Sequence, residues 1–182
     1  MSVLKSKLFS KYIFLLLGFV FIISTSADMS DKDTNAKLKA IFIYNFTKYI
    51  EWPATSKSGN FKIGILGDYS SLKEELTKMA SVKKVGLQTI EVVSYNSVND
   101  VKDAQIIFIT ESKNNSIGGV LGKIAGKSTL VLCDTESMAK KGAGISFFTA
   151  ENKQKFALNT ANVTKYNLKL SSTLTKLAAV VH

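Results

Sequence analysis

Hydrophobic positions along the chain follow two patterns in turn, first one typical of a helix and then one in which strands alternate with helices. From Ala36 to Trp52 apolar residues recur every three or four positions, and Pro53 then ends the helix because the residue before a proline avoids helical backbone angles. Short apolar runs predict strands at Phe61–Leu66, Thr89–Ser94, Gln105–Thr110, Thr129–Cys133, Gly144–Phe148 and Lys155–Asn159. Helical spacing predicts helices at Leu72–Val82, Ile117–Ala125, Asn162–Tyr166 and Ser172–Val181, and a short helical turn at Met138–Lys141.

The alternation of strands and helices predicts an α/β fold, with a mainly parallel sheet and helices on both faces. The runs Gln105–Thr110 and Thr129–Cys133 are apolar enough to be buried on both sides, as central parallel strands are. The polar turn Thr149–Gln154 separates the last two predicted strands, which we expect to form an antiparallel C-terminal hairpin. Ser71 and Glu74 have the spacing of a capping box at the start of the second helix.

The first predicted helix has a narrow polar face and a broad apolar one. Spacings of seven, four and three residues align four polar side chains on a face toward solvent: Lys37, Tyr44, Lys48 and Glu51. A second line runs through Leu38, Ile41, Phe42, Asn45, Tyr49 and Trp52, and the apolar surface is widened by Ile43, Phe46 and Ile50, so we expect the helix to be sandwiched in the interior. A helix with so much apolar surface belongs to the core or offers part of that surface to a partner. The four polar residues are therefore candidate partner-facing positions.

The segment before this helix has the three parts of a secretory signal peptide. Lys5, Lys7 and Lys11 form a positive region, the uncharged run Tyr12–Ile23 is apolar, and small residues end at Ala27. The apolar run is shorter than the roughly 20 residues of a membrane-spanning helix, although an uncleaved anchor is the alternative if its flanks are included. We therefore predict that residues 1–27 are cleaved and that the mature protein is exported.

The chain without this leader has the size of one domain and a basic surface. We expect a flexible lead at residues 28–35 and a single domain at residues 36–182, because about 150 residues suffice for one core. The chain has 24 basic residues, all lysine, and 14 acidic residues; 21 lysines remain once the three of the leader are removed. Scattered lysines are typical of a solvated surface, and the lack of arginine and the export signal both argue against nucleic acid as a partner.

Residue types needed for most catalytic chemistry are missing from the sequence. His182, the single histidine, is the last residue, and Cys133 is the single cysteine, so neither a catalytic triad nor a cysteine–histidine zinc site can form. Cys133 ends a predicted strand, where we expect a buried thiol; an intermolecular disulfide and a reactive thiol are the alternatives. We therefore predict a protein that is not an enzyme and holds no cofactor and no metal.

One group of carboxylates is nevertheless arranged like a ligand site, because each follows a predicted strand: Asp68, Glu111 and Asp134. The carboxyl ends of parallel strands meet at one edge of a sheet, so these side chains are candidates for a crevice that binds a solute or a divalent cation. A metal-assisted hydrolase would rest on the same residues. The simpler interpretation is that each carboxylate caps the helix that follows it.

Several stretches of the chain resemble, in order, the YfiR family of exported bacterial proteins. The first is an aromatic helix that ends in Glu-Trp-Pro, at Ile43–Pro53, and the second is a strand with a Gly-Asp turn, at Phe61–Asp68. A glycine-rich hairpin strand follows at Gly142–Phe148, and a closing segment consists of Phe156–Asn159 with Leu168–Ala178. The resemblance implies a non-catalytic periplasmic repressor that binds the periplasmic sensory part of an inner-membrane diguanylate cyclase. It also implies an outer-membrane-associated protein that sequesters the repressor, and it allows a homodimer. Some relatives carry cysteine pairs, whereas Cys133 has no intramolecular partner.

Two functions from different classes follow from these observations. The first is a regulator that restrains an inner-membrane signalling protein, either a diguanylate cyclase or a sensor histidine kinase. The alternative is a periplasmic solute-binding protein with a ligand in the crevice formed by Asp68, Glu111 and Asp134. The regulator accounts for the ordered motifs, and the solute-binding protein accounts for the three carboxylates.

Overall fold

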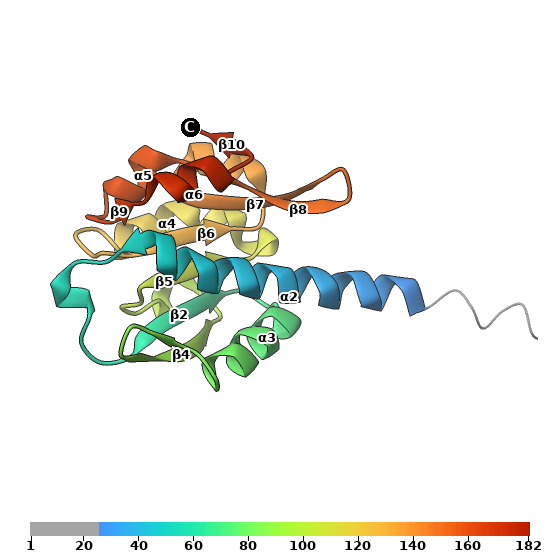
Figure 1. Cartoon of the computed structure of the whole chain (residues 1–182), viewed down its shortest axis with the longest axis horizontal. Helices are drawn as coiled ribbons and strands as arrows, with labels where there is room; N and C mark the ends of the chain where they lie inside the picture. Colours follow the sequence, from blue (N-terminus) through green and yellow to red (C-terminus); the bar gives the residue numbers. More distant parts are fainter. Residues whose placement is uncertain (1–25) are drawn as a thin grey trace, which may run out of the picture. The chain divides into compact units, whose positions relative to one another are not determined.

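The chain from Asn35 onward folds around an eight-stranded sheet with helices on both faces (Figure 1). The computed structural model describes residues 26–182, and only the backbone of residues 26–33. Contacts divide the chain into two units, Met1–Thr34 and Asn35–His182, and the second unit is the domain described below. Residues 1–25 of the predicted leader lie outside the described part. No helix within that part combines the length and the apolar content needed to cross a bilayer.

The strand order of the sheet is β10-β8-β7-β6-β5-β2-β4-β3. The five central strands, β4, β2, β5, β6 and β7, are parallel to one another. β8 runs antiparallel to β7, and β3 runs antiparallel to β4. The predicted α/β class, the mainly parallel sheet and the C-terminal hairpin are confirmed. The strands of the sheet are β2 (Phe61–Leu66), β3 (Lys84–Val85), β4 (Gln88–Tyr95), β5 (Ile106–Ile109), β6 (Leu130–Cys133), β7 (Ile145–Ala150), β8 (Lys153–Leu158) and β10 (Val180–Val181). A separate antiparallel ribbon pairs β1 (Ile50–Glu51) with β9 (Lys169–Leu170).

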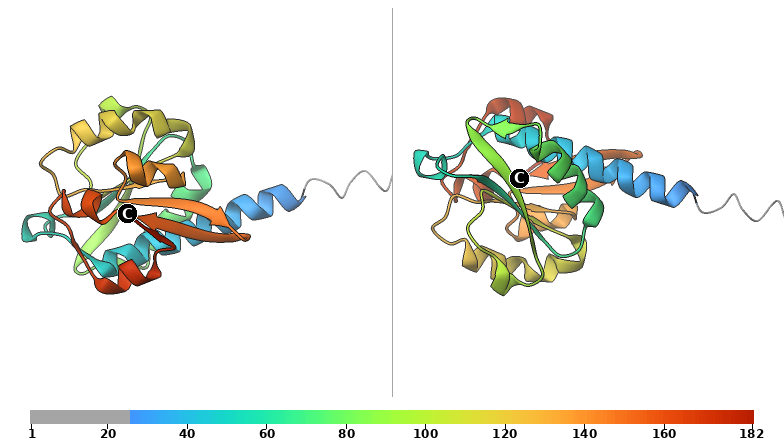
Figure 2. Two further views of the ribbon diagram at one scale, coloured as in Figure 1. Left: turned by 90° about the horizontal axis from the view of Figure 1, so that it is seen from above. Right: turned by 90° about the horizontal axis from the view of Figure 1, so that it is seen from below.

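Helices α2 and α3 cover one face of the sheet, and α4 covers the other (Figure 2). The aromatic rings of Phe42 and Phe46 on α2 contact Phe147 on β7 and Phe156 on β8, with ring centroids 5.1–6.1 Å apart. The helices are α2 (Ser26–Tyr49), α3 (Ser70–Ala80), α4 (Ile117–Lys123), α5 (Thr160–Thr164) and α6 (Ser172–Leu177). Short 3-10 turns are η2 (Ala54–Ser56), η3 (Val98–Asp100), η4 (Glu111–Ser116) and η5 (Glu136–Lys141).

The core lies between α2 and the central strands. Every residue of β5 and of β6 is buried, which confirms that these strands are covered on both faces. The buried side of α2 consists of Ala36, Lys39, Ala40, Ile43 and Phe46, followed by Ile50 and Trp52 beyond the helix. Burial of this aromatic and aliphatic surface is the main force that holds α2 on the sheet.

The first helix differs from the prediction in its bounds and in its buried side. It begins at Ser26 in place of Ala36, and it ends at Tyr49, so that Glu51 belongs to the strand β1 and not to the helix. Leu38 and Ile41 were expected in the interior but are 38% and 42% exposed. Lys39 is buried in their place. The apolar pattern therefore predicted the existence of the helix correctly and its orientation only in part.

Other local predictions also need correction. Ser71 does not cap α3, which starts one residue earlier and whose N-cap residue, Tyr69, makes no side-chain cap hydrogen bond. The predicted helix Ser172–Val181 ends at Leu177, and the chain then forms β10 beside β8. The two-residue strands β1, β3, β9 and β10 are too short for periodicity to reveal them.

Candidate functional site

A groove of about 610 Å³ opens beside the C-terminal end of α2, and we call it the α2 groove. Its walls are β1 and the residues just before it, the turn between β3 and β4, and β9. The lining includes apolar side chains from each of these segments: Tyr49, Trp52, Phe61, Val85, Leu87 and Leu170. A concave surface of this size with an apolar lining is typical of a binding site.

The groove exists because the chain leaves the helical conformation at Tyr49. The Tyr49 carbonyl accepts a hydrogen bond from the amide of Ser171 at 2.9 Å, and this contact joins the end of α2 to the ribbon of β1 and β9. Trp52 then turns inward, where its indole N–H donates to the Gln105 carbonyl at 3.3 Å and its ring meets Phe61 edge-on at 5.0 Å. The indole thus forms a fixed apolar wall.

The opposite wall is the tight β3–β4 hairpin. Gly86 occupies the first turn position with φ of +59°, a backbone conformation that glycine adopts without strain, as in a type II′ turn. Leu87 follows and is 97% exposed, at the rim of the groove. Gln88 holds the base of the hairpin, since its buried side-chain amide donates to the carbonyls of Ser56, Ser58 and Gly59 at 3.2–3.3 Å. A leucine so exposed on a well-anchored turn is a candidate contact residue.

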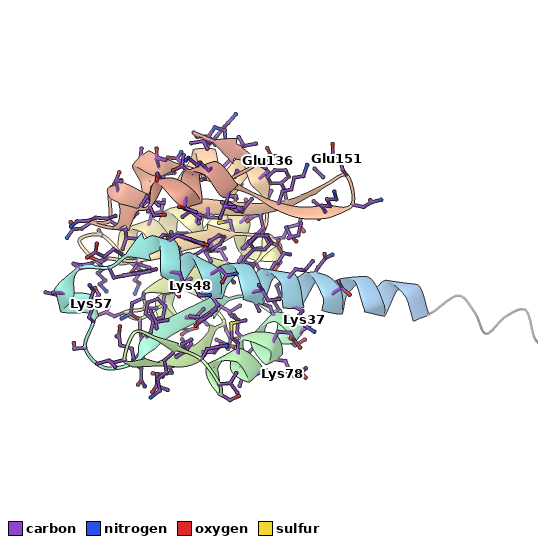
Figure 3. All side chains as sticks on the ribbon, viewed as in Figure 1. Lys37, Lys48, Lys57, Lys78, Glu136 and Glu151 are labelled. Carbon is purple, nitrogen blue, oxygen red and sulfur yellow. The ribbon has the colours of Figure 1, made fainter. Side chains whose placement is uncertain are left out.

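Charged side chains around the groove are mainly lysines. Lys48, Lys57 and Lys169 are exposed and line it, whereas Glu51 is the only acidic lining residue. Glu51 lies 3.6 Å from Lys57, and both side chains are more than half exposed, so this pair contributes little to stability. Figure 3 shows Lys48 on α2 and Lys57 on the segment that follows it. The rim is therefore positive, which favours a partner with carboxylates.

The solvent-exposed side of α2 continues the apolar surface beyond the groove. We call it the outer face of α2 and define it by Lys37, Leu38, Ile41, Asn45 and Lys48, which are exposed or partly exposed. Leu38 and Ile41 supply apolar area, and Lys48 donates to the Asn45 side chain at 3.0 Å. Because leucine and isoleucine next to lysines on one helix face are suited to a protein interface, this face is a candidate docking surface.

The four predicted partner-facing residues are thus brought partly together. Lys48 and Glu51 line the groove, and Lys37 lies on the outer face of α2. Tyr44 is only half-exposed, because its hydroxyl donates to the Lys84 carbonyl on β3 at 3.5 Å, and the Lys48 ammonium lies 4.8 Å from its ring centroid. Whether these residues contact a partner stays a prediction.

Sequence reasoning missed the apolar members of this surface. Ile41 lies four residues after Lys37 and three before Tyr44, so the helical spacing that selected those two residues also selects Ile41. Leu87 had a weaker signal, a Gly-Leu pair just before the predicted strand Thr89–Ser94.

The predicted crevice carboxylates follow three adjacent strands, but their surroundings differ. Asp134, after β6, forms an ion pair with the buried ammonium of Lys39 at 2.6 Å, and its second oxygen lies 2.8 Å away. Lys39 also donates to the Tyr69 hydroxyl at 3.3 Å, and its ammonium lies 5.2 Å from the centre of that ring. The Asp134 carboxylate therefore balances the buried charge of Lys39, and its oxygens are already engaged and poorly available to a ligand.

The other two carboxylates, Asp68 and Glu111, are exposed. Neither lines the α2 groove. Among the described residues no group of three histidine, cysteine, aspartate or glutamate side chains is placed to hold a metal ion. The interpretation as helix caps is supported only in part, since Glu111 lies in the first turn of η4 while α3, η4 and η5 have no side-chain cap hydrogen bond. The alternative function as a solute-binding protein loses its main observation.

Cys133 is fully buried at the end of β6, as expected. Burial, and to a smaller degree the nearby Asp134 carboxylate, raise the pKa of its thiol to about 12. A thiol that stays protonated is a poor nucleophile. A disulfide with another chain would require β6 to open first.

The comparisons with known proteins decide the family. The model of the YfiR/HmsC-like family matches residues 36–179, which is nearly the whole folded domain. This chain belongs to the YfiR/HmsC-like family. The YfiR/HmsC-like family is a regulatory, non-catalytic family of the periplasm. None of the curated proteins compared matches the sequence.

Solved structures add information on the fold of this YfiR/HmsC-like protein. One similar chain is the "ABC domain in complex with L-Trp" from Streptococcus pneumonia, with a TM-score of 0.50 and 12% sequence identity. The match covers 66% of this chain and 55% of that chain, so this protein spans little more than half the length of its structural relative. At this identity the likeness shows a shared fold alone.

Proposed function

We propose that this protein is an exported regulator that binds the periplasmic sensory part of an inner-membrane signalling protein and restrains its output. The observation that carries the proposal is the family match over residues 36–179. The best effector on this basis is a diguanylate cyclase, with a sensor histidine kinase as the second type. An outer-membrane-associated protein that competes for the regulator completes the proposal.

The binding surface we propose consists of the α2 groove and the outer face of α2. Leu87, Ile41 and Leu38 provide exposed apolar area, and Lys48 links the two parts because it belongs to both. Exposed apolar side chains surrounded by lysines suit an interface with an apolar centre and a polar rim. Glu51, Lys37 and Tyr44 lie in or beside this surface and are expected to tune specificity more than affinity.

Site-specific crosslinking in cells tests this proposal. A photoreactive amino acid replaces Ile41 or Leu87, and crosslinked membrane proteins are identified by mass spectrometry. The matched control replaces Val181, which is 46% exposed and lies at the other end of the sheet order, on β10. We expect a membrane cyclase or kinase to be captured from Ile41 and Leu87 but not from Val181. Capture of no membrane sensor by exported, folded protein would refute the function.

The restraining effect needs its own measurement. Deletion of the protein should raise cyclic-di-GMP several-fold if the effector is a cyclase, and complementation should reverse the rise. A change in phosphorylation of a response regulator without a change in cyclic-di-GMP would identify a kinase as the effector. The double variant Ile41→Ser with Leu87→Ser should raise the signal as the deletion does, while the protein stays folded.

A further inference from the structure

The β3–β4 hairpin and the residues just before it carry the two most exposed large apolar side chains of the described part of the chain. Leu87, in the turn, is 97% exposed, and Val82, two residues before β3, is 75% exposed. The other exposed large apolar side chains of the described residues are 38–56% exposed. A single exposed leucine is common on a soluble protein, but two nearly bare apolar side chains on one short hairpin indicate an interaction site.

The hairpin is anchored at its base and stands clear of the domain at its turn. The Gln88 side chain bonds to three backbone carbonyls, and the Tyr44 hydroxyl donates to the Lys84 carbonyl at 3.5 Å. A Cβ atom on Gly86 would meet no other atom within 4 Å. The turn therefore presents Leu87 as a convex point, and no part of the hairpin has to become ordered before it can bind.

Lysines surround this apolar point, and acidic residues are absent from the segment. Residues 76–90 contain no aspartate or glutamate. Lys83 and Lys84 are both exposed, directly before and within β3. Lys48 on α2 lies close to them, because its ammonium is 4.8 Å from the ring of Tyr44, whose hydroxyl contacts β3. The hairpin thus combines exposed apolar side chains with uncompensated positive charge.

A phospholipid bilayer fits this combination better than the surface of another protein does. A stable protein interface buries about 800 Å² on each partner and packs around a broad apolar centre, which a convex two-residue turn does not offer. The fluid interface of a bilayer accommodates a convex point, with apolar side chains in the acyl boundary and lysines at the level of the phosphates. Anionic lipid attracts each lysine that lies near the surface.

We propose that the β3–β4 hairpin docks this protein onto an anionic phospholipid bilayer. Leu87 enters the boundary between headgroups and acyl chains, and Val82 adds apolar contact. Lys83, Lys84 and Lys48 bind the lipid phosphates. The inference goes beyond the proposed function, since the bilayer contact requires no sensor. Because Leu87 also forms the rim of the α2 groove, docking places that groove at the membrane surface, where the periplasmic part of an inner-membrane protein begins.

Vesicle flotation of the mature chain, residues 28–182, tests the docking without the apolar leader, and the unit Asn35–His182 is compact by itself. We expect the protein to float with vesicles of phosphatidylethanolamine that contain about one-third phosphatidylglycerol and not with phosphatidylcholine vesicles. Binding should decline as salt is added, because salt screens the lysines. Leu87→Ser should weaken binding about tenfold. The matched control Leu177→Ser, at a residue of α6 that is 56% exposed, should bind like the parent.

A second set of variants tests the charges. Lys83→Gln with Lys84→Gln should weaken binding to the anionic vesicles about tenfold, because two cations leave the lipid surface. The matched control is Lys140→Gln with Lys141→Gln, a second exposed pair of neighbouring lysines, on η5, and it should bind like the parent. Circular dichroism checks that each variant is folded. Equal weakening by both pairs would show attraction by net charge alone and would overturn the assignment to the hairpin.

A fluorescent label reports the insertion directly. In a Cys133→Ala background, an environment-sensitive dye on Leu87→Cys should brighten and shift to the blue with anionic vesicles, whereas the same dye on Val181→Cys should not change. Absence of flotation with anionic vesicles, or binding that survives Leu87→Ser, would overturn the proposal. A dye that responds to the periplasmic part of a sensor but not to vesicles would also overturn it and assign the hairpin to a protein interface. Vesicles contain no sensor, so these results are independent of the crosslinking test of the proposed function.

Discussion

The inner and outer faces of α2 use the same residue types in opposite ways. The inner face buries a lysine, Lys39, which is 7% exposed, among Ala36, Ile43 and Phe46. The outer face leaves Leu38 and Ile41 in contact with solvent. The buried lysine is tolerated because Asp134 balances the charge of its ammonium group and the Tyr69 hydroxyl accepts a hydrogen bond from it. The side chains of Leu38 and Ile41 stay exposed to solvent. The comparison indicates that the inner face provides stability and that the outer face is available for recognition.

The largest effect is expected from the inner face. Phe46→Ala should lower the free energy of unfolding by about 3–5 kcal/mol, because it leaves a cavity between α2 and the sheet. Phe46 is 2% exposed and contacts the rings of Phe147 and Phe156. Urea unfolding followed by circular dichroism measures the loss. A loss below 1 kcal/mol would mean that α2 contributes little to the core.

The buried ion pair should come next. Asp134→Ala leaves the Lys39 ammonium buried without its counter-charge and should cost about 3 kcal/mol. The double variant Lys39→Met with Asp134→Ala should recover most of that loss, because no unpaired charge remains. The same urea titrations measure both variants. Equal losses in the single and the double variant would show that the pair is not coupled.

Buried and exposed polar groups also differ in their dependence on pH, and Cys133 offers the test. Its thiol ionises near 9.0 when exposed, whereas burial raises the pKa in the folded state to about 12. The unfolded chain therefore loses its proton first, and stability should fall by up to about 1.4 kcal/mol per pH unit as the pH rises from 9 toward 12. Cys133→Ala should lack this part of the decline in a comparison of urea unfolding at pH 8 and pH 10. An identical slope in both proteins would contradict the burial of the thiol.

The outer face should give the smallest change in stability and a clear change in binding. Ile41→Ser and Leu38→Ser should alter the free energy of unfolding by no more than about 0.5 kcal/mol, as is usual for surface positions. Capture of the membrane partner by crosslinking should nevertheless fall about tenfold. Val181→Ser is the control of similar exposure and should leave capture unchanged. Normal capture by both outer-face variants would move the interface elsewhere.

The sequence predicts the elements of this fold well because each carries its own periodic pattern. The strand Gln105–Thr110 and the hairpin strands at Gly144–Phe148 and Lys155–Asn159 lie within a few residues of β5, β7 and β8. Their apolar runs and the polar turn between the last two are local properties. Local patterns therefore sufficed for the fold class.

The site was less predictable because its geometry depends on contacts between distant segments. Lys39 looks like a surface residue until Asp134, 95 residues later, is placed beside it. Tyr44 has the spacing of an exposed residue, but β3 lies against it and accepts its hydroxyl hydrogen bond. The α2 groove forms only where α2, β3 and β9 come together, so no single segment of the sequence predicts it.

Trp52 is the only tryptophan of the chain, and its position makes it a built-in optical probe. Trp52 is 4% exposed, follows β1 directly and lines the α2 groove. Excitation near 295 nm therefore reports on one place in the molecule, without any label. Emission of the native protein should lie at short wavelength, as for a shielded indole, and shift to the red on unfolding. A ligand or partner that enters the groove should change the quantum yield before any change in secondary structure, so that occupancy can be followed in real time.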